Sequence, residues 1–316
     1  MLKYVMKRLG YAFLTILVLI IITFFMIHAA PGDPFSNGKA MSEATKLALQ
    51  EQYGLNKSVP EQLLIYIGNI FQGNLGISTK YARPVTKIIA DSFPASFDLG
   101  IRALFIAVVG GIFIGTYAAV RRGKKADSAA MAVAVIGVSI PSFIVAALLQ
   151  YFVALKINQL LGPGKQLFPI SGWTSEMHKI LPAIALSLGP LATISRLMRT
   201  SMLDVLHADY IKTAKAKGLS ERMIIWKHAL RNALMPVITV LGPITATVLT
   251  GAFVVEQVFS IPGMGKYFVI GITENDYLLT AGTTVFYGVF LVLSTLIVDL
   301  LYGVIDPRVK ISKAKE

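Results

Sequence analysis

The chain has 316 residues, of which 55% are hydrophobic and only 15% are charged, and its mean hydropathy is +0.66. A soluble globular domain carries about 25% charged residues, so this composition excludes an ordinary soluble protein and predicts an integral membrane protein. The formal net charge is +13. The basic residues lie in clusters between apolar runs, which is a membrane-orientation pattern and not a nucleic-acid-binding patch.

The first apolar run is uncharged from Tyr11 to Ala29. It is longer than the roughly 7–15 residues of a signal-peptide core, and the small-x-small pattern expected at a cleavage site is poor. We therefore predict a retained first span over 9–29, so that 1–30 comprise an N-terminal tip and one transmembrane helix.

Residues 31–98 form a predicted external helical region. Ser58 and Glu61 match the capping-box pattern S-x-x-E, and Pro60 suits the first turn of a helix that Gly73 would end. A second helix is predicted from Ser42 to Gly54. A region of this size can form a lid on the spans, but it is too small for a large core of its own.

Five further segments contain the roughly 20 apolar residues that a helix needs to cross a bilayer. Their ranges are 99–120, 129–155, 180–198, 236–258 and 278–304. The range 180–198 gives the weakest signal because it contains Pro182 and Pro190, although neighbouring helices can satisfy backbone groups that proline frees. The predicted fold is an all-α integral membrane protein with six transmembrane helices, whose core of five helices spans 99–304.

The basic residues predict the orientation of these spans. Most of the 30 Lys and Arg residues belong to one set of segments, namely the N-terminus, 121–128, 199–235 and the tail 305–316. The loop "RRGKKAD" is nearly pure positive charge. The positive-inside rule therefore predicts a multi-pass protein of the bacterial cell membrane with both termini in the cytoplasm.

Few ionisable residues lie within the spans. Glu256, Asp299 and Arg102 lie near span ends and are interpreted as interfacial residues, which disfavours a gradient-driven transporter with a central relay. The four histidines lack ligand spacing, and zero cysteines exclude thiolate sites, so no metal site is predicted. The sequence contains no G-x-x-x-x-G-K-[ST] phosphate loop and no nucleophile elbow, so we expect no catalytic residue.

The loop 199–235 between the fourth and fifth spans has strong helix signals. Ser201 and Asp204 match a capping box for a helix over 204–218, and Gly218 suits its end. Ser220 then caps a second helix that starts at Glu221. The first helix is predicted to expose small residues beside larger ones, which favours close contact with a partner protein. A helix lying on anionic lipid is the open alternative.

The stretch "DYIKTAKAKGLSE", with "HALRNALMP" after it, resembles the EAA loop of the permease subunits of ABC importers, in the variant of the peptide importers. Lys212, Thr213 and Ala214 occupy the E-A-A positions, so a glutamate contact cannot be carried over. The segments "HAAPGDP", "YGLNKSVPEQ", "GNLGIS", "RPVTKIIADSFPASFDL", "VEQVFSIPGMGK" and "DPRVK" also resemble the B-type member of the paired oligopeptide or dipeptide permeases.

The resemblance implies that helix 204–218 is a coupling helix seated in a groove of an ATP-binding subunit. The contact residues would be Leu206, Asp209, Tyr210, Thr213, Ala214, Lys217, Gly218 and Leu219. The implied partners are a second, homologous permease subunit, two ATP-binding subunits, an extracytoplasmic peptide-binding protein and membrane lipid. No cofactor would bind this chain, because ATP and Mg would be used by the partner subunits.

Two further motifs have a functional and a purely structural interpretation. In "SIPSF", Ser139 and Pro141 form either a pore kink or a kink that serves packing alone. The stretch around "IPGMG" is either a plain turn or a gate or binding-protein contact. The candidate residues of this second site are Glu256, Phe259, Pro262, Gly263 and Gly265.

The resemblance implies an ATP-driven importer of oligopeptides or dipeptides that a solute-binding protein delivers. Within the same family, nickel, glutathione or another small solute is the alternative, because selectivity resides mostly in the binding protein. A gradient-driven secondary peptide transporter is a more distant alternative. A channel or lipid-facing structural protein would leave the predicted helix–glycine–helix loop without a partner.

Overall fold

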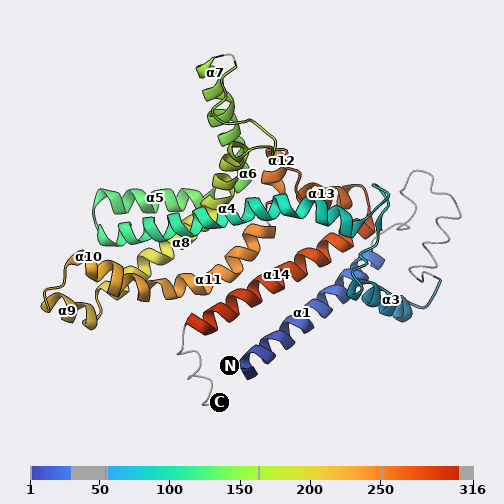
Figure 1. Cartoon of the computed structure of the whole chain (residues 1–316), viewed down its shortest axis with the longest axis horizontal. Helices are drawn as coiled ribbons and strands as arrows, with labels where there is room; N and C mark the ends of the chain where they lie inside the picture. The colour runs from blue at the N-terminus through green and yellow to red at the C-terminus, as the bar shows by residue number, and fades with distance from the viewer. Residues whose placement is uncertain (1, 30–53, 55, 163, 251, 306–316) are drawn as a thin grey trace. The chain divides into compact units, whose positions relative to one another are not determined.

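The computed structural model describes residues 2–29, 54, 56–162, 164–250 and 252–305 (Figure 1). Most of the predicted helix from Ser42 to Gly54, and the "DPRVK" motif, lie outside these residues. The chain divides into two compact units, which are Met1–Ala95 with Pro262–Leu296 and Ser96–Ile261 with Ile297–Glu316. Each unit is described by itself.

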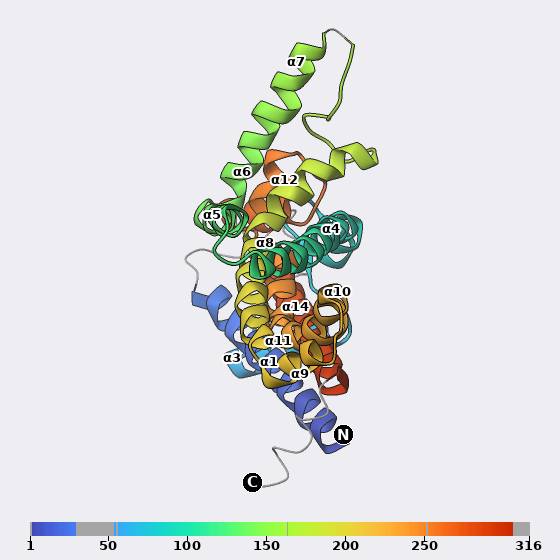
Figure 2. The ribbon, with the colours of Figure 1, turned by 90° about the vertical axis from the view of Figure 1, so that its left-hand side faces the viewer.

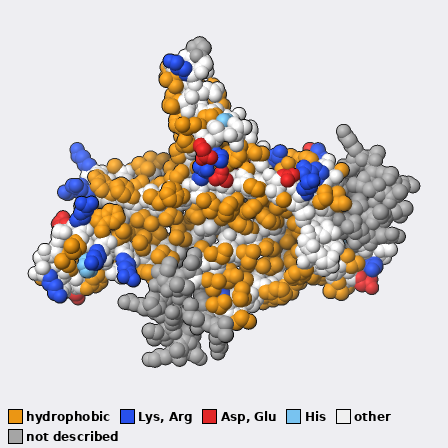
Figure 3. All heavy atoms as spheres, in the orientation of Figure 1, with side chains coloured by type: hydrophobic (Ala, Val, Ile, Leu, Met, Phe, Trp, Pro, Cys, Tyr) orange, Lys and Arg blue, Asp and Glu red, His pale blue; other side chains and the backbone are white. Residues whose placement is uncertain are grey.

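Within the described residues, six helical segments are long and apolar enough to cross a membrane. They are Val5–Ala29, Val85–Val120, Ser142–Leu161, Glu176–Leu206, Glu221–Val258 and Tyr277–Val298. The all-helical prediction with six spans is therefore confirmed. Hydrophobic side chains cover much of the surface in Figure 3, and Phe105 and Phe113 on α4 are 67% and 63% exposed, as expected of lipid-facing positions.

The first unit contains α1 (Leu2–Ala29), α3 (Val59–Phe71), β1 (Ile77–Ser78), β2 (Arg83–Pro84), the start of α4 (Val85–Val120), α13 (Gly265–Thr273) and most of α14 (Tyr277–Ile305). The predicted capping box is present, since the Glu61 carboxylate accepts a hydrogen bond from the Ser58 N–H at 3.2 Å. Gly73 follows α3 with φ +77°. The side chains of His28 on α1 and Gln62 on α3 meet at 2.8 Å.

A short antiparallel hairpin pairs Ile77 with Pro84 and Ser78 with Arg83. The buried Asp276 carboxylate, just before α14, accepts hydrogen bonds from the Ser78 hydroxyl and from the Lys80 N–H, the latter at 3.0 Å. It also accepts from the Leu279 N–H at 3.1 Å. One carboxylate therefore caps α14 and holds the hairpin against it.

The second unit contains the rest of α4, then α5 (Lys125–Ser139), α6 (Ser142–Leu148), the π-helix η1 (Leu149–Lys156), α7 (Ile157–Leu161), α8 (Glu176–Leu206), α9 (Asp209–Ala216), α10 (Glu221–Met223), the π-helix η2 (Ile224–Ala229), α11 (Leu230–Thr250) and α12 (Phe253–Val258). Helix α8 packs against α5, α6 and α11, and is therefore the centre of this unit.

The third predicted span, 129–155 with a kink at Pro141, is divided into two helices at that proline, and the segment long and apolar enough to cross a membrane is Ser142–Leu161. Helix α5 ends at Ser139, and α6 starts at Ser142 after the Ile140–Pro141 break. Ile140 is extended, with φ −94° and ψ 123°, because a following proline disfavours helical geometry. Figures 1 and 2 show α6 and α7 leaving the line of α5 at this break.

Three other span boundaries differ from the prediction. Helix α4 starts at Val85 and not at 99, so the second span continues a helix that begins in the segment predicted as external. Pro236 lies inside α11 and does not open the fifth span, whose helical run starts at Glu221. Helix α8 extends beyond 180–198 at both ends and contains Pro182 and Pro190.

Arg102 is not an isolated interfacial residue. Its guanidinium contacts Asp98 at 2.7 Å and Glu176 at 2.8 Å. Lys179 contacts Asp98 at 3.0 Å and Glu176 at 2.8 Å, which closes a ring of four ion pairs, two of which join α4 to α8. The exposed fractions of these side chains range from 17% to 69%, so solvent screening keeps the net contribution of each pair small.

Candidate functional site

The loop predicted as a coupling helix contains a corner that the sequence did not predict. Helix α8 runs through Asp204 to Leu206, and α9 begins only at Asp209. The predicted capping box at Ser201 is therefore wrong, because Ser201 is buried inside a helix that is already formed. Ala208, with φ −66° and ψ 148°, is the extended residue that separates the two helices.

The glycine corner after α9 is confirmed. Gly218 has φ +77°, and its N–H donates to the Lys215 carbonyl at 2.9 Å. The next N–H, from Leu219, donates to the Ala214 carbonyl at 3.3 Å. Ser220 caps the following helix by accepting from the Met223 N–H at 3.4 Å, as predicted. Glycine suits this position because side chains disfavour positive φ.

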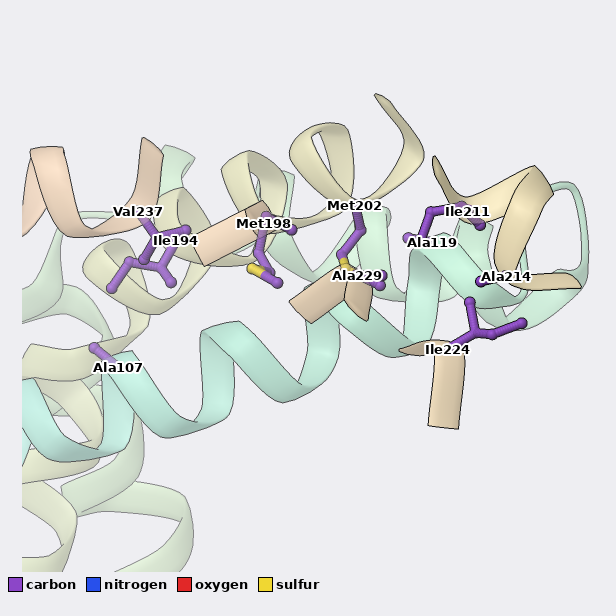
Figure 4. Packing of buried hydrophobic residues seen from close by; sticks show 11 residues of the cluster. Ala107, Ala119, Ile194, Met198, Met202, Ile211, Ala214, Ile224, Ala229 and Val237 are labelled. Atoms are coloured by element: carbon purple, nitrogen blue, oxygen red, sulfur yellow. The ribbon is translucent and has the colours of Figure 1, made fainter. Parts of the chain in front are cut away.

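One face of α9 belongs to the core of this chain. Ile211 and Ala214 are 0% and 7% exposed, and they pack in one cluster with Ala119, Met202 and Ile224 (Figure 4). The prediction that Ala214 is an exposed contact residue is therefore wrong. Residues three apart share a helix face, so the register that buries Ile211 also buries Ala214.

The opposite face of α9 is exposed. Among the predicted contact residues, Leu206 and Leu219 are half-buried, whereas the exposed ones are Asp209, Tyr210, Thr213, Lys217 and Gly218. We call these five exposed residues the α9 surface. Figure 3 shows basic side chains near α9 and near the α4–α5 turn. The structure thus leaves most of the predicted contact residues exposed on α9 or directly after it, while the other face of α9 is anchored in the core.

Tyr210 is held in place by a residue that the sequence did not identify. Its hydroxyl accepts a hydrogen bond from the Asn232 amide at 3.1 Å, and that amide also donates to the His228 carbonyl at 3.0 Å. Tyr210 is nevertheless 46% exposed. No periodic signal joins residues that are 22 apart on different helices, so only the tertiary structure reveals this contact.

A second contact that the sequence did not reveal is an ion pair between α8 and α5. Arg199 on α8 forms a bidentate ion pair with Asp127 on α5, with contacts of 2.6 and 2.8 Å. The Gly123 N–H also donates to Asp127 at 3.1 Å. The hydrogen bonds from Arg199 lower the pKa of the Asp127 carboxyl, against an opposing effect of desolvation. The basic loop 121–128 therefore contains an acid that is already paired.

The candidate gate residues fall on both units. Glu256 and Phe259, in and directly after α12, are each 1% exposed in the second unit. The Phe259 carbonyl accepts from the Gly172 N–H at 2.8 Å. The remaining three candidates belong to the first unit, in which Pro262 is exposed while Gly263 and Gly265 are buried. Their role as a gate or binding-protein contact stays a prediction.

Ser139 and Pro141 lie at the α5–α6 break, and Pro141 lines a cavity of 260 Å³. An adjoining cavity of 300 Å³ lies between α5, α8 and α11. The Ser139 hydroxyl donates to the Val135 carbonyl at 2.8 Å and is not among the lining residues. In the part of the chain that the structure describes, no group of three or more His, Cys, Asp or Glu side chains could hold a metal ion.

Comparison with known families identifies two matching segments. Residues 111–311 match the model of the binding-protein-dependent transport system inner membrane component. Residues 1–100 match the model of the N-terminal part of a binding-protein-dependent transport system membrane component. Together the two matches cover nearly the whole chain.

Similar curated proteins match over their full lengths. The dipeptide transport system permease protein DppB of Bacillus subtilis is 48% identical over 99% of this chain and 99% of its own. The oligopeptide transport system permease protein OppB of Haemophilus influenzae is 41% identical over 98% of this chain and 100% of its own. A solved inward-facing MetNI methionine ABC transporter chain is 18% identical, with a TM-score of 0.55 over 69% of this chain and 96% of that chain, and shares the fold.

Proposed function

Because this chain belongs to the binding-protein-dependent transport system inner membrane component family, we propose that it is the permease subunit through which an ATP-driven importer passes dipeptides or oligopeptides. It is a multi-pass inner membrane protein. Relatives at 48% and 41% identity are named as dipeptide and oligopeptide permeases, which favours peptides over nickel, glutathione or another small solute.

The importer contains partners that perform the steps this chain lacks. A binding protein delivers the peptide, two ATP-binding subunits hydrolyse ATP with Mg, and a second, homologous permease completes the passage. The absence of a phosphate loop from the sequence supports the assignment of hydrolysis to separate subunits. Clustering of Lys and Arg in 121–128 and 199–235 supports a cytoplasmic position for these loops and for both termini.

The α9 surface is the site where an ATP-binding subunit docks. The observation that supports this assignment is the contrast between the two faces of α9. Tyr210 and Thr213 are exposed on one face, while Ile211 and Ala214 on the other are packed in the core. A helix on a lipid surface would instead bury apolar side chains in the bilayer, whereas the exposed α9 surface contains Asp209, Thr213 and Lys217.

The core behind α9 transmits movement to the spans. Ile211 and Ala214 share a buried cluster with Met202 on α8 and Val237 on α11 (Figure 4). Close-packed interiors resist local deformation, so a displacement of α9 by the closing ATP-binding subunits moves the ends of both spans. ATP binding thereby turns the passage outward, and hydrolysis with release returns it inward.

Reconstitution tests this function. The chain, its second permease and the ATP-binding subunits are placed in vesicles with the loaded binding protein, and uptake of a labelled dipeptide is followed. We expect uptake only with ATP and all partners present. Uptake that follows an imposed proton or sodium gradient without ATP would instead establish a secondary transporter.

A further inference from the structure

Three prolines of the second unit, one at a break between two helices and two inside continuous helices, line the same pair of cavities. Pro141 separates α5 from α6, Pro190 lies within α8, and Pro243 lies within α11. Pro141 and Pro190 line the cavity of 260 Å³, and Pro190 and Pro243 line the adjoining cavity of 300 Å³. Both α8 and α11 contain a second proline, Pro182 and Pro236 respectively, which lines neither cavity.

Each of these prolines changes the hydrogen bonding of the helix around it. Proline has no N–H, so the carbonyl four residues earlier loses its usual helical donor. For Pro190 this carbonyl belongs to Leu186, and for Pro141 it belongs to Gly137. Both residues line the cavity of 260 Å³. The Gly137 carbonyl oxygen lies 3.8 Å from the position that a Cβ would take on Gly189. Gly137 is buried, and a Cβ on it would lie 3.2 Å from the Leu188 carbonyl oxygen, so this glycine allows α5 and α8 to pack closely.

Hydroxyl groups add further acceptors. The Thr193 hydroxyl donates to the Gly189 carbonyl at 3.1 Å, and the Thr247 hydroxyl donates to the Pro243 carbonyl at 2.8 Å. A hydroxyl has one hydrogen and two lone pairs, so each of these threonines can offer a ligand only lone pairs. Among the described residues that line the two cavities, none is charged. The wall is therefore neutral and mostly apolar, with the two threonine hydroxyls as hydrogen-bond acceptors within it.

We propose that this acceptor surface, formed by Leu186, Gly189, Thr193 and Thr247, binds the main-chain N–H groups of a peptide during its passage; the inference rests on the proposed import function. A main-chain N–H is a donor that peptides share whatever their side chains. Acceptors pair with it, whereas they repel carboxylate oxygens. The surface therefore holds the peptide by its backbone and does not select a charged side chain.

Replacement of the threonines tests the proposal in the complete reconstituted importer. Thr193→Val combined with Thr247→Val keeps the side-chain shape but removes the lone pairs. A net hydrogen bond of about 0.5–1.5 kcal/mol corresponds to roughly 2–12-fold, so we expect the double variant to lower dipeptide uptake about 5-fold or more at saturating loaded binding protein. Thr239→Val is the matched control, because its hydroxyl makes the same bond within α11, to the Met235 carbonyl at 3.1 Å, outside both cavities.

A second pair of variants tests the backbone acceptor. Pro190→Ala supplies an N–H that can occupy the Leu186 carbonyl, and we expect it to reduce uptake. Pro182→Ala in the same helix should leave uptake within about 2-fold, since its effect falls outside the cavities. Thr193→Ser with Thr247→Ser retains both hydroxyls and should retain uptake, which separates lost acceptors from lost folding.

A dipeptide methylated on its main-chain nitrogen, and thus without that N–H, supplies the chemical readout. Wild-type importer should transport it more slowly than the parent peptide when each saturates the binding protein. The Thr193→Val and Thr247→Val double variant should lose this discrimination. Unchanged uptake by the double variant, or full discrimination retained in it, would overturn the proposal. Absence of ATP-driven peptide uptake by the wild type would instead overturn the import function itself.

Discussion

The contribution of the Asp127–Arg199 ion pair to stability depends on how far its two side chains are buried. The carboxylate is 7% exposed and the guanidinium 25% exposed, and the pair joins α5 to α8 beneath the α9 core. An exposed pair contributes about 0–1 kcal/mol, whereas removal of one partner from a fully buried pair costs about 3–5 kcal/mol. We expect the energetic effect of breaking the Asp127–Arg199 pair to lie between these two values, because Arg199 retains some contact with solvent.

We predict that Asp127→Asn lowers the free energy of unfolding by about 2 kcal/mol, because it leaves the Arg199 charge uncompensated. Thermal unfolding of the purified subunit in detergent measures the effect. Asp91→Asn is the matched control, since Asp91 pairs with Arg83 while both side chains are 42% or more exposed. If Asp91→Asn lowered the free energy of unfolding as much as Asp127→Asn does, burial of the ion pair could not explain the effect.

The same ion pair predicts a pH dependence. Arg199 holds the pKa of the Asp127 carboxyl below its usual value of about 3.9. The folded state therefore binds this proton less readily than the unfolded state, so the stabilisation is present above about pH 4 and is lost as the pH falls through the lowered pKa. The stability difference between wild type and Asp127→Asn should shrink between pH 6 and pH 3. A constant difference would exclude the carboxylate as its source.

At the scale of elements, the division of α9 into two faces separates folding from docking. Ala214 lies in the core of the chain itself, so a charge placed there destabilises the subunit and reports little about a partner. Thr213 lies on the exposed face, one residue earlier. The two adjacent positions should therefore respond differently to substitution.

We predict that Thr213→Trp leaves the thermal stability of the isolated subunit unchanged but reduces co-purification of the ATP-binding subunits at least about 10-fold, because a bulky ring prevents close approach to α9. Thr273→Trp is the control. Both threonines are exposed, and both hydroxyls donate to the carbonyl four residues earlier at 3.1 Å. Normal assembly of Thr213→Trp would show that another surface docks the ATP-binding subunits.

At the scale of the whole molecule, the six spans and the charge distribution together predict a topology. The chain contains no native cysteine, so single introduced cysteines report their own positions. Lys57, Lys124 and Lys215 are all exposed and lie in three different loops. They suit labelling because replacement of an exposed lysine costs little stability.

In intact cells, a membrane-impermeant thiol reagent should label Lys57→Cys but neither Lys124→Cys nor Lys215→Cys. Permeabilisation should then expose the other two. The physical reason is the preference of Lys and Arg clusters for the cytoplasmic side. Labelling of Lys215→Cys from outside would invert the loop that contains α9 and would exclude docking of a cytoplasmic ATP-binding subunit there.

The features that sequence patterns predict correctly are those that arise from neighbouring residues. Runs of apolar residues predict six spans because a helix needs about 20 apolar residues to cross the hydrocarbon, and the described residues contain six helical segments that are long and apolar enough. Local cap chemistry correctly predicts the start of α3 at Ser58, the corner at Gly218 and the cap at Ser220. The same local rule fails at Ser201, where the pattern lies inside a continuous helix.

Which side of a helix faces the core depends on how the helices pack against one another. Thr213 and Ala214 are both small and adjacent in sequence, yet one is exposed and the other buried, because Ile211 sets the register of α9 against α8 and α11. The Asp127–Arg199 pair and the convergence of Pro141, Pro190 and Pro243 on adjoining cavities likewise join distant segments. Periodicity and spacing describe one helix at a time, whereas such contacts depend on how separate helices pack.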